Sequence, residues 1–119
     1  MPYLELMVNV DIKDEKAFAL ELSKVGAEAL GKPEAYITVS VTVNQTLTFA
    51  GTFDPAFSLS VVSLDNLGPE QNEKYSAILS KFLDDKLGIP SDRGYICFQD
   101  PGRGYLGYKG TTFATIFKS

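Results

Sequence analysis

Two stretches, Leu30-Gly31-Lys32-Pro33 and Leu87-Gly88-Ile89-Pro90, decide how this chain of 119 residues is expected to fold. Each puts glycine where a helix ends and proline just beyond, a frequent signature of a helix C-terminus. Each is followed by a Tyr-Ile pair that opens an apolar run, at Tyr36-Ile37 and at Tyr95-Ile96, with the second gap two residues longer. This self-similarity indicates an internal duplication, the strongest organisational signal in the chain.

The residues around the first stretch predict a βαβ unit. Residues 3–10 are mostly apolar and predict a strand. A stripe at helical spacing follows and ends at Gly31. Residues 36–43 are rich in β-branched side chains and predict a second strand, which the helix can connect to the first in parallel. The stripe consists of Phe18, Leu22, Val25 and Ala29.

The residues around the second stretch repeat this order. Residues 57–64 predict a strand, and Gly68-Pro69-Glu70 predicts the start of a helix, because proline is favoured in the first turn. Residues 95–99 predict the next strand. The apolar face expected for this helix consists of Tyr75, Ile78, Leu79, Phe82 and Leu83.

These patterns predict one α/β (α+β) domain over residues 1–119 with pseudo-two-fold βαβ repeats at about 2–44 and 56–100. The expected sheet is mixed and four-stranded, with both helices on one face. Residues 57–64 do not alternate cleanly between apolar and polar, so we expect a sheet that is apolar on both faces and covered by oligomerisation. Residues of about 105–117 predict short strands and no helix, suited to pairing with a neighbouring subunit.

Charge and hydropathy exclude several classes of protein. The formal net charge is −4, with 11 basic against 15 acidic residues, which disfavours nucleic-acid binding. No apolar run is long enough to span a membrane, and no secretory signal is recognisable. We therefore expect cytoplasmic localisation, with export that needs no signal peptide as the alternative.

The absence of histidine narrows the chemistry further. It excludes histidine-based triads and histidine-ligated zinc. The lone Cys97 can form neither an internal disulfide nor a cysteine-rich metal site, and we expect no metal and no cofactor. A catalytic base must then be a carboxylate, a lysine, a tyrosine or the N-terminal amine.

The opening Met1-Pro2 leads directly into the first predicted strand. Removal of Met1 would expose the secondary amine of Pro2 at a rigid strand end. An α-amine titrates near roughly pH 8, and burial or a neighbouring cation lowers its pKa toward the range of a general base. Lys32 has two interpretations: a cation that stabilises the helix C-terminus, or one that binds an anionic substrate.

A Gly102-Arg103-Gly104-Tyr105-Leu106-Gly107 stretch matches G-x-G-x-x-G. In dinucleotide-binding folds that motif opens a helix inside a βαβ unit, and no such unit follows here. We interpret the stretch as a glycine-rich turn.

Taken together, the chain resembles the macrophage migration inhibitory factor family of the tautomerase superfamily. The opening residues 2–6 look particularly like the dopachrome tautomerase branch. The resemblance covers nearly the whole chain, and its anchors are Met1-Pro2, Gly31-Lys32-Pro33, residues 55–64, Asp92-Arg93 before Tyr95-Ile96, Gly107-Tyr108 and Thr112-Phe113-Ala114.

The resemblance implies a homotrimer with sheets facing a central channel and a pocket at each subunit interface. It implies that Pro2 is the base of a keto–enol tautomerase acting on aromatic 2-oxo acids or dopachrome-like compounds. Lys32 would bind the carboxylate or stabilise the enolate, and Tyr95 would come from the neighbouring subunit. The other implied substrate contacts are Tyr36, Ser63, Leu64, Cys97, Leu106, Tyr108 and Phe113.

Two positions and one short stretch depart from the family pattern. Cys97 stands where the cytokine branch commonly has asparagine, and Tyr108 where tryptophan is familiar. Residues 56–59 lack the Cys-x-x-Cys of some members, which excludes a thiol–disulfide role through that motif. The alternative function is a cytokine-like protein that binds a receptor and whose pocket is weakly active or vestigial.

Overall fold

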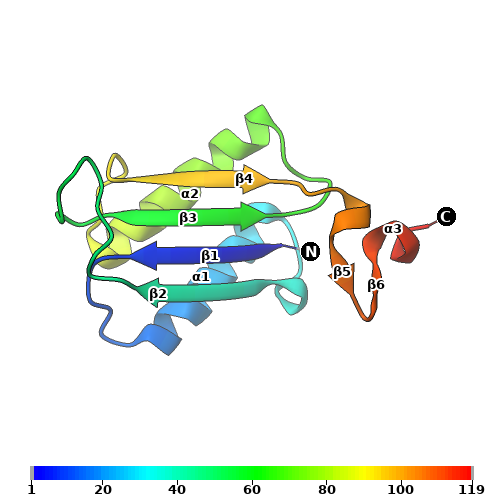
Figure 1. Cartoon of the computed structure of the whole chain (residues 1–119), viewed down its shortest axis with the longest axis horizontal. Helices are drawn as coiled ribbons and strands as arrows, with labels where there is room; N and C mark the ends of the chain where they lie inside the picture. The colour runs from blue at the N-terminus through cyan, green and yellow to red at the C-terminus, as the bar shows by residue number, and fades with distance from the viewer. Residues whose placement is uncertain (1, 119) are drawn as a thin grey trace.

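The computed structural model describes residues 2–118, so the expected removal of Met1 lies outside the described residues. A four-stranded mixed sheet has the order β2-β1-β3-β4. Strands β1 and β2 are parallel, as are β3 and β4, while β1 and β3 are antiparallel. Two βαβ units therefore meet along their first strands, as the duplication predicts (Figure 1).

The first unit consists of β1 (Tyr3–Val8), α1 (Glu15–Leu30) and β2 (Thr38–Val43). Asp14 caps α1 by accepting a hydrogen bond from the Ala17 N–H at 3.0 Å. Gly31 ends the helix in the left-handed conformation (φ 66°), as its sequence predicts. The second strand begins later than expected, because a 3₁₀ turn, η1 (Glu34–Tyr36), precedes it.

The second unit consists of β3 (Phe57–Val62), α2 (Pro69–Leu87) and β4 (Gly94–Gln99). Proline opens α2 and a left-handed Gly88 ends it, again as predicted. The helix buries four of the five expected residues. Ile78, which was also expected on the apolar face, is 44% exposed.

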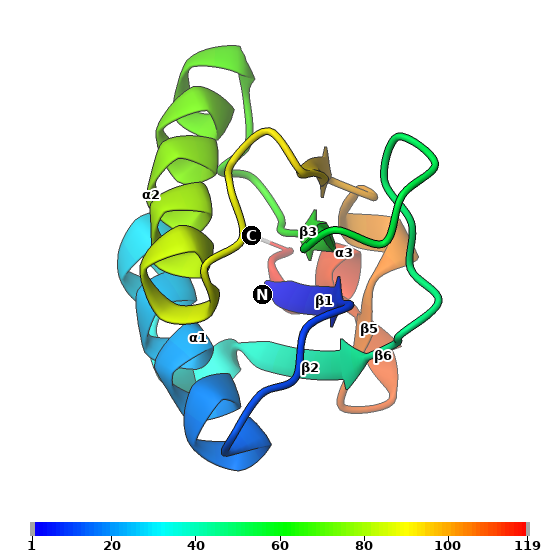
Figure 2. The same cartoon turned by 90° about the vertical axis from the view of Figure 1, so that its left-hand side faces the viewer.

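Both helices cover the same face of the sheet (Figure 2). The core lies between the helices and the sheet, and the side chains of Leu4, Leu59 and Leu79 are fully buried in it. The opposite face is mostly polar, with Glu5 between Ser40 and Ser60 at its centre and Met7 as an apolar exception in β1. The expectation of a sheet apolar on both faces was therefore wrong, since only Val62 interrupts the alternation of β3.

The segment after β4 differs in part from expectation. It contains η2 (Arg103–Tyr105) and a hairpin of β5 (Gly107–Tyr108) and β6 (Thr111–Thr112). It also contains a one-turn helix, α3 (Phe113–Ile116), so the expectation of no helix was wrong. The two strands pair with each other. Pairing with a neighbouring subunit stays a prediction.

No helix within residues 2–118 is both long and apolar enough to cross a membrane.

Candidate active site

One edge of the sheet gathers most of the residues expected at the site. At this edge β1 and β2 begin, while β3 and β4 end (Figure 1). The chain returns to it through α1, because that helix connects two parallel strands. The β5–β6 hairpin and α3 lie just beyond it (Figure 1). Residues distant in sequence therefore meet beside Pro2.

A cavity of about 260 Å³ opens at this edge. Its walls come from the start of β1, from η1 and the start of β2, and from the C-terminal hairpin and α3. Tyr108 and Phe113 form a parallel pair with ring centroids 5.6 Å apart. The lining residues are Pro2, Tyr3, Ala35, Tyr36, Ile37, Thr38, Leu106, Gly107, Tyr108 and Phe113.

The structure thus brings together five of the predicted site residues, namely Pro2, Tyr36, Leu106, Tyr108 and Phe113. Pro2 is fully buried. Its carbonyl accepts a hydrogen bond from the Thr38 N–H at 3.2 Å, which continues the ladder between β1 and β2. The proline ring is therefore held in place at the head of a strand.

Lys32, Ser63 and Leu64 are on the same edge but do not line the cavity. Lys32 is half-buried in the turn that follows α1. Ser63 and Leu64 are buried directly after β3, where the Ser63 hydroxyl donates to the Asn66 side chain. Asn66 in turn donates to the Leu30 carbonyl at 3.0 Å. This network fixes the end of α1, and hence Lys32, against the end of β3.

Tyr95 lies near the opposite edge. It is level with Ser58 in the sheet, and Ser58 is level with Met7. Met7 is five residues further along the chain than Pro2, which in an extended strand corresponds to about 17 Å. Tyr95 is 79% exposed, and its ring packs 5.3 Å from Phe49. Within one chain, then, Tyr95 does not reach the Pro2 cavity.

Cys97 lies on the polar face of β4, level with Ser60, and is exposed. It does not line the cavity. Among residues 2–118, no three histidine, cysteine, aspartate or glutamate side chains gather in a way that could hold a metal ion.

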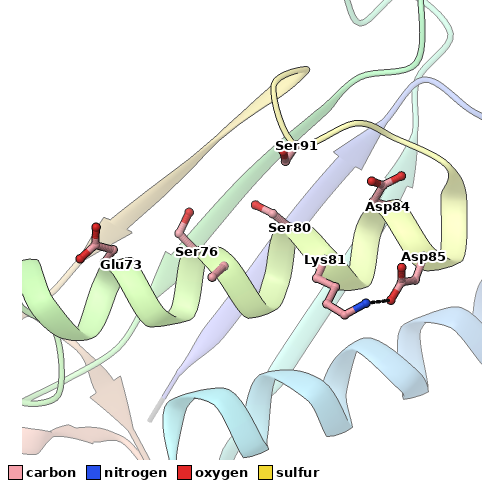
Figure 3. Close-up of a pocket in the computed structure, with 8 residues that line it drawn as sticks. Glu73, Ser76, Ser80, Lys81, Asp84, Asp85 and Ser91 are labelled. Atoms are coloured by element: carbon pink, nitrogen blue, oxygen red, sulfur yellow. Dashed lines mark hydrogen bonds and ion pairs between the residues drawn. The ribbon is translucent and has the colours of Figure 1, made fainter.

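A larger hollow of about 680 Å³ lies along the outer side of α2, beside Ser76, Ser80 and Asp84 (Figure 3). Its walls are polar and mostly exposed, and its only cation, Lys81, is paired with Asp85 at 2.8 Å. It contains no buried group of unusual chemistry. We therefore assign the site to the smaller cavity at Pro2.

The sequence did not predict five of the ten residues that line the Pro2 cavity. Tyr3 and Thr38 are signalled only by strand register, which sets them opposite each other. Ile37 lies just before β2 and carries no chemical signal. Ala35 and Gly107 have small side chains and carry no chemical signal. No spacing in the sequence indicates that residues 106–113 approach Pro2.

Fold and site define a class: an α+β protein of duplicated βαβ units with an aromatic cavity at the head of its first strand. A family model described as macrophage migration inhibitory factor (MIF) matches residues 1–114. A homolog of that factor from Trichuris trichiura is 41% identical over 114 residues, which cover 95% of this chain and 100% of the relative. The factor from Rattus norvegicus is 41% identical over 99 residues, which cover 83% of this chain and 86% of the relative.

The solved structure of the macrophage migration inhibitory factor from Trichinella spiralis superimposes with a TM-score of 0.87 at 33% identity. The match covers 93% of this chain and 99% of that one. The chain belongs to the macrophage migration inhibitory factor family. The proteins of this family belong to the tautomerase superfamily.

Proposed function

We propose that the protein is a cofactor-independent keto–enol tautomerase of small aromatic 2-oxo acids, such as phenylpyruvate, or of dopachrome-like compounds. The observation that carries the proposal is Pro2, fully buried at the head of β1 and lining an aromatic cavity. Once Met1 is removed, its secondary amine is a general base at a fixed position. The walls at Tyr36, Tyr108 and Phe113 suit an aryl group.

The proposed reaction is an isomerisation that needs no oxidant or second substrate. The Pro2 amine accepts a proton on one side of the substrate and returns a proton on the other. In ketonisation the enol O–H bond breaks, a C–H bond forms at the adjacent carbon, and the double bond moves from carbon–carbon to carbon–oxygen. Lys32, held beside this edge of the sheet, would bind the carboxylate or stabilise the enolate as an ammonium group.

The test is a Pro2→Gly variant assayed for ketonisation of enol-phenylpyruvate, after intact mass has established that Met1 is absent. Glycine keeps a terminal amine but is a weaker base without the rigid ring. We expect kcat/KM to fall about 10²- to 10⁴-fold, the contribution typical of general acid–base catalysis. Unchanged kcat/KM in a folded variant would contradict the mechanism.

A matched control separates the amine from the ring. An extra alanine before Pro2 keeps the buried ring but converts the amine into an amide, which is not a base. This extended form should lose activity as Pro2→Gly does. If it stays fully active, Pro2 serves only as a wall of the cavity.

The second candidate is a cytokine-like protein that binds a receptor. It is favoured by the 41% identity to the rat protein, whose name describes an effect on macrophages. Receptor binding through the outer surface would survive Pro2→Gly, so a macrophage migration assay with this variant separates the two functions.

A further inference from the structure

The cavity wall that faces the sheet is formed by the C-terminal part of the chain. Four lining residues, from Leu106 to Phe113, lie in residues 103–118, which we call the C-terminal module. The elements of this module pack on one another, with α3 against η2 and β6. Figure 1 shows the module beyond the strand ends. Contacts outside the sheet must therefore set its position relative to Pro2.

An ion pair joins the module to the body of the protein. The Nε of Arg103, in η2, donates to a carboxylate oxygen of Asp65 at 3.0 Å. Asp65 lies in the turn after β3 with φ 65°, a left-handed conformation that aspartate adopts more readily than most residues. The pair therefore spans 38 positions of sequence, from the sheet to the module.

Asp100 forms a second tie at the same place. One of its carboxylate oxygens accepts the Asp65 N–H at 3.0 Å, and the other accepts the Gly102 N–H at 2.9 Å. Asp65 is thus held twice, by its backbone to Asp100 and by its side chain to Arg103. The two ties fix both the entry to the module and its first turn.

Aromatic contacts connect the ion pair with the cavity. The Arg103 guanidinium lies 5.1 Å from the centre of the Phe117 ring. Phe117 packs 5.1 Å from Phe113, and Phe113 stacks on Tyr108. Tyr108 and Phe113 line the cavity, and Phe113 is only 2% exposed. A displacement of Arg103 would therefore move Phe117, and through it Phe113 in the cavity wall.

We propose that the Asp65–Arg103 ion pair, supported by Asp100, is a clasp that positions the aromatic wall for the aryl group of the substrate. Asp65 and Arg103 are positioning residues, and their link to the substrate rests on the proposed tautomerase function. Both side chains are about half exposed, at 45% and 49%. Because exposed ion pairs contribute little to global stability, the clasp acts on the module rather than on the whole fold.

The experiment uses Asp65→Asn, Arg103→Gln and the double variant, with Lys81→Gln as control. Lys81→Gln also breaks an exposed ion pair and removes one positive charge, but on α2, away from the cavity. Hydrogen exchange followed by mass spectrometry measures opening of residues 103–118. We expect faster exchange there in each clasp variant, and the same exchange as the parent in the control. Unchanged exchange in the clasp variants would overturn the proposal.

The second readout is steady-state kinetics with phenylpyruvate. Loss of the clasp should raise KM about two- to fivefold with kcat nearly unchanged, since a displaced aryl wall weakens substrate and transition state alike. The ion pair is lost in all three variants, whereas the contact of Arg103 with the Phe117 ring is lost only where Arg103 is replaced. The double variant should therefore resemble Arg103→Gln and should not sum the two single effects. Additive effects, or faster exchange with unchanged KM, would overturn the positioning role. If the parent protein has no tautomerase activity, the proposed function fails, while the exchange measurement still decides whether the clasp exists.

Discussion

At the scale of single residues, Asn9 shows how a buried polar group organises the fold. It follows β1 and is only 7% exposed. Its amide nitrogen donates to the carbonyls of Leu47, Phe53 and Asp54 at 2.9–3.2 Å. Its side-chain oxygen accepts the Ala56 N–H at 2.8 Å. The Asn9 side chain thus satisfies backbone groups of the long connection between β2 and β3 that have no neighbouring strand to pair with.

We expect Asn9→Ala to lower the free energy of unfolding by about 2–4 kcal/mol, because each buried group left without a partner costs about 1–3 kcal/mol. Asn9→Asp keeps the acceptor but turns a carboxylate toward three carbonyls, so it should be the more damaging change at neutral pH. Urea denaturation measures both variants.

Gln45→Ala is the control for Asn9. Gln45 also forms an amide hydrogen bond, to Asp11 at 2.9 Å, but it is exposed. Its loss should change the free energy of unfolding by no more than about 0.5 kcal/mol. If Asn9→Ala and Gln45→Ala lower the free energy of unfolding equally, burial of the Asn9 hydrogen bonds does not account for their contribution to stability.

At the scale of elements, the two loops that end β3 and β4 are joined by Asp100. Hydrogen bonds from the Asp65 and Gly102 backbone N–H groups hold the pKa of the Asp100 carboxyl below its ordinary value of 3.8, with a smaller contribution from Arg103. A folded-state pKa below the unfolded one means that this stabilisation is complete above the unfolded pKa. It is lost as the pH falls through the folded pKa.

The comparison of the parent with Asp100→Asn tests this tie. Asparagine keeps one acceptor and no charge, so the parent should be the more stable protein at pH 6. The difference in free energy of unfolding should stay constant down to about pH 5 and shrink at lower pH, as Asp100 becomes protonated. Denaturant unfolding of both proteins from pH 6 to pH 3 measures it. A difference that stays constant over this range would contradict the assignment.

Elements were predictable from sequence where a local signal was strong. Gly31 and Gly88 end the two helices as predicted because the left-handed cap favours glycine. The one-turn α3 escaped prediction because four residues have no measurable period. The polar face of the sheet was misjudged because Val62 breaks the alternation of β3 at its end.

The candidate site was less predictable than the fold. The absence of histidine and the position of Pro2 indicated a possible amine base from the residues alone. That Tyr108 and Phe113 close a cavity around Pro2 depends on tertiary contacts across more than 100 positions of sequence. Only the family resemblance pointed to these residues, because no local pattern encodes such a contact.

At the scale of the whole molecule, aromatic side chains gather at both edges of the sheet. One edge has the Pro2 cavity. The other presents Tyr95, which is 79% exposed and packs on Phe49, and Phe53, which is 64% exposed. Arg93 fixes this second group by donating to the Phe49, Asp54 and Pro55 carbonyls at 2.8–3.1 Å. Such exposed and rigidly held aromatic groups are typical of interfaces between protein chains.

The family resemblance implies a homotrimer in which Tyr95 of one subunit completes the Pro2 cavity of the next, and the exposed Tyr95 is available for such a contact. Light scattering should give three times the 13.0 kDa mass of one chain. Mixing tests the shared site directly. Pro2→Gly and Tyr95→Ala should each be weakly active alone. When they are unfolded and refolded together, some interfaces combine an intact Pro2 with an intact Tyr95 from different subunits, and activity should return in part. If both residues served the same subunit's site, no mixed trimer would contain an intact site, and the mixture would be no more active than its components.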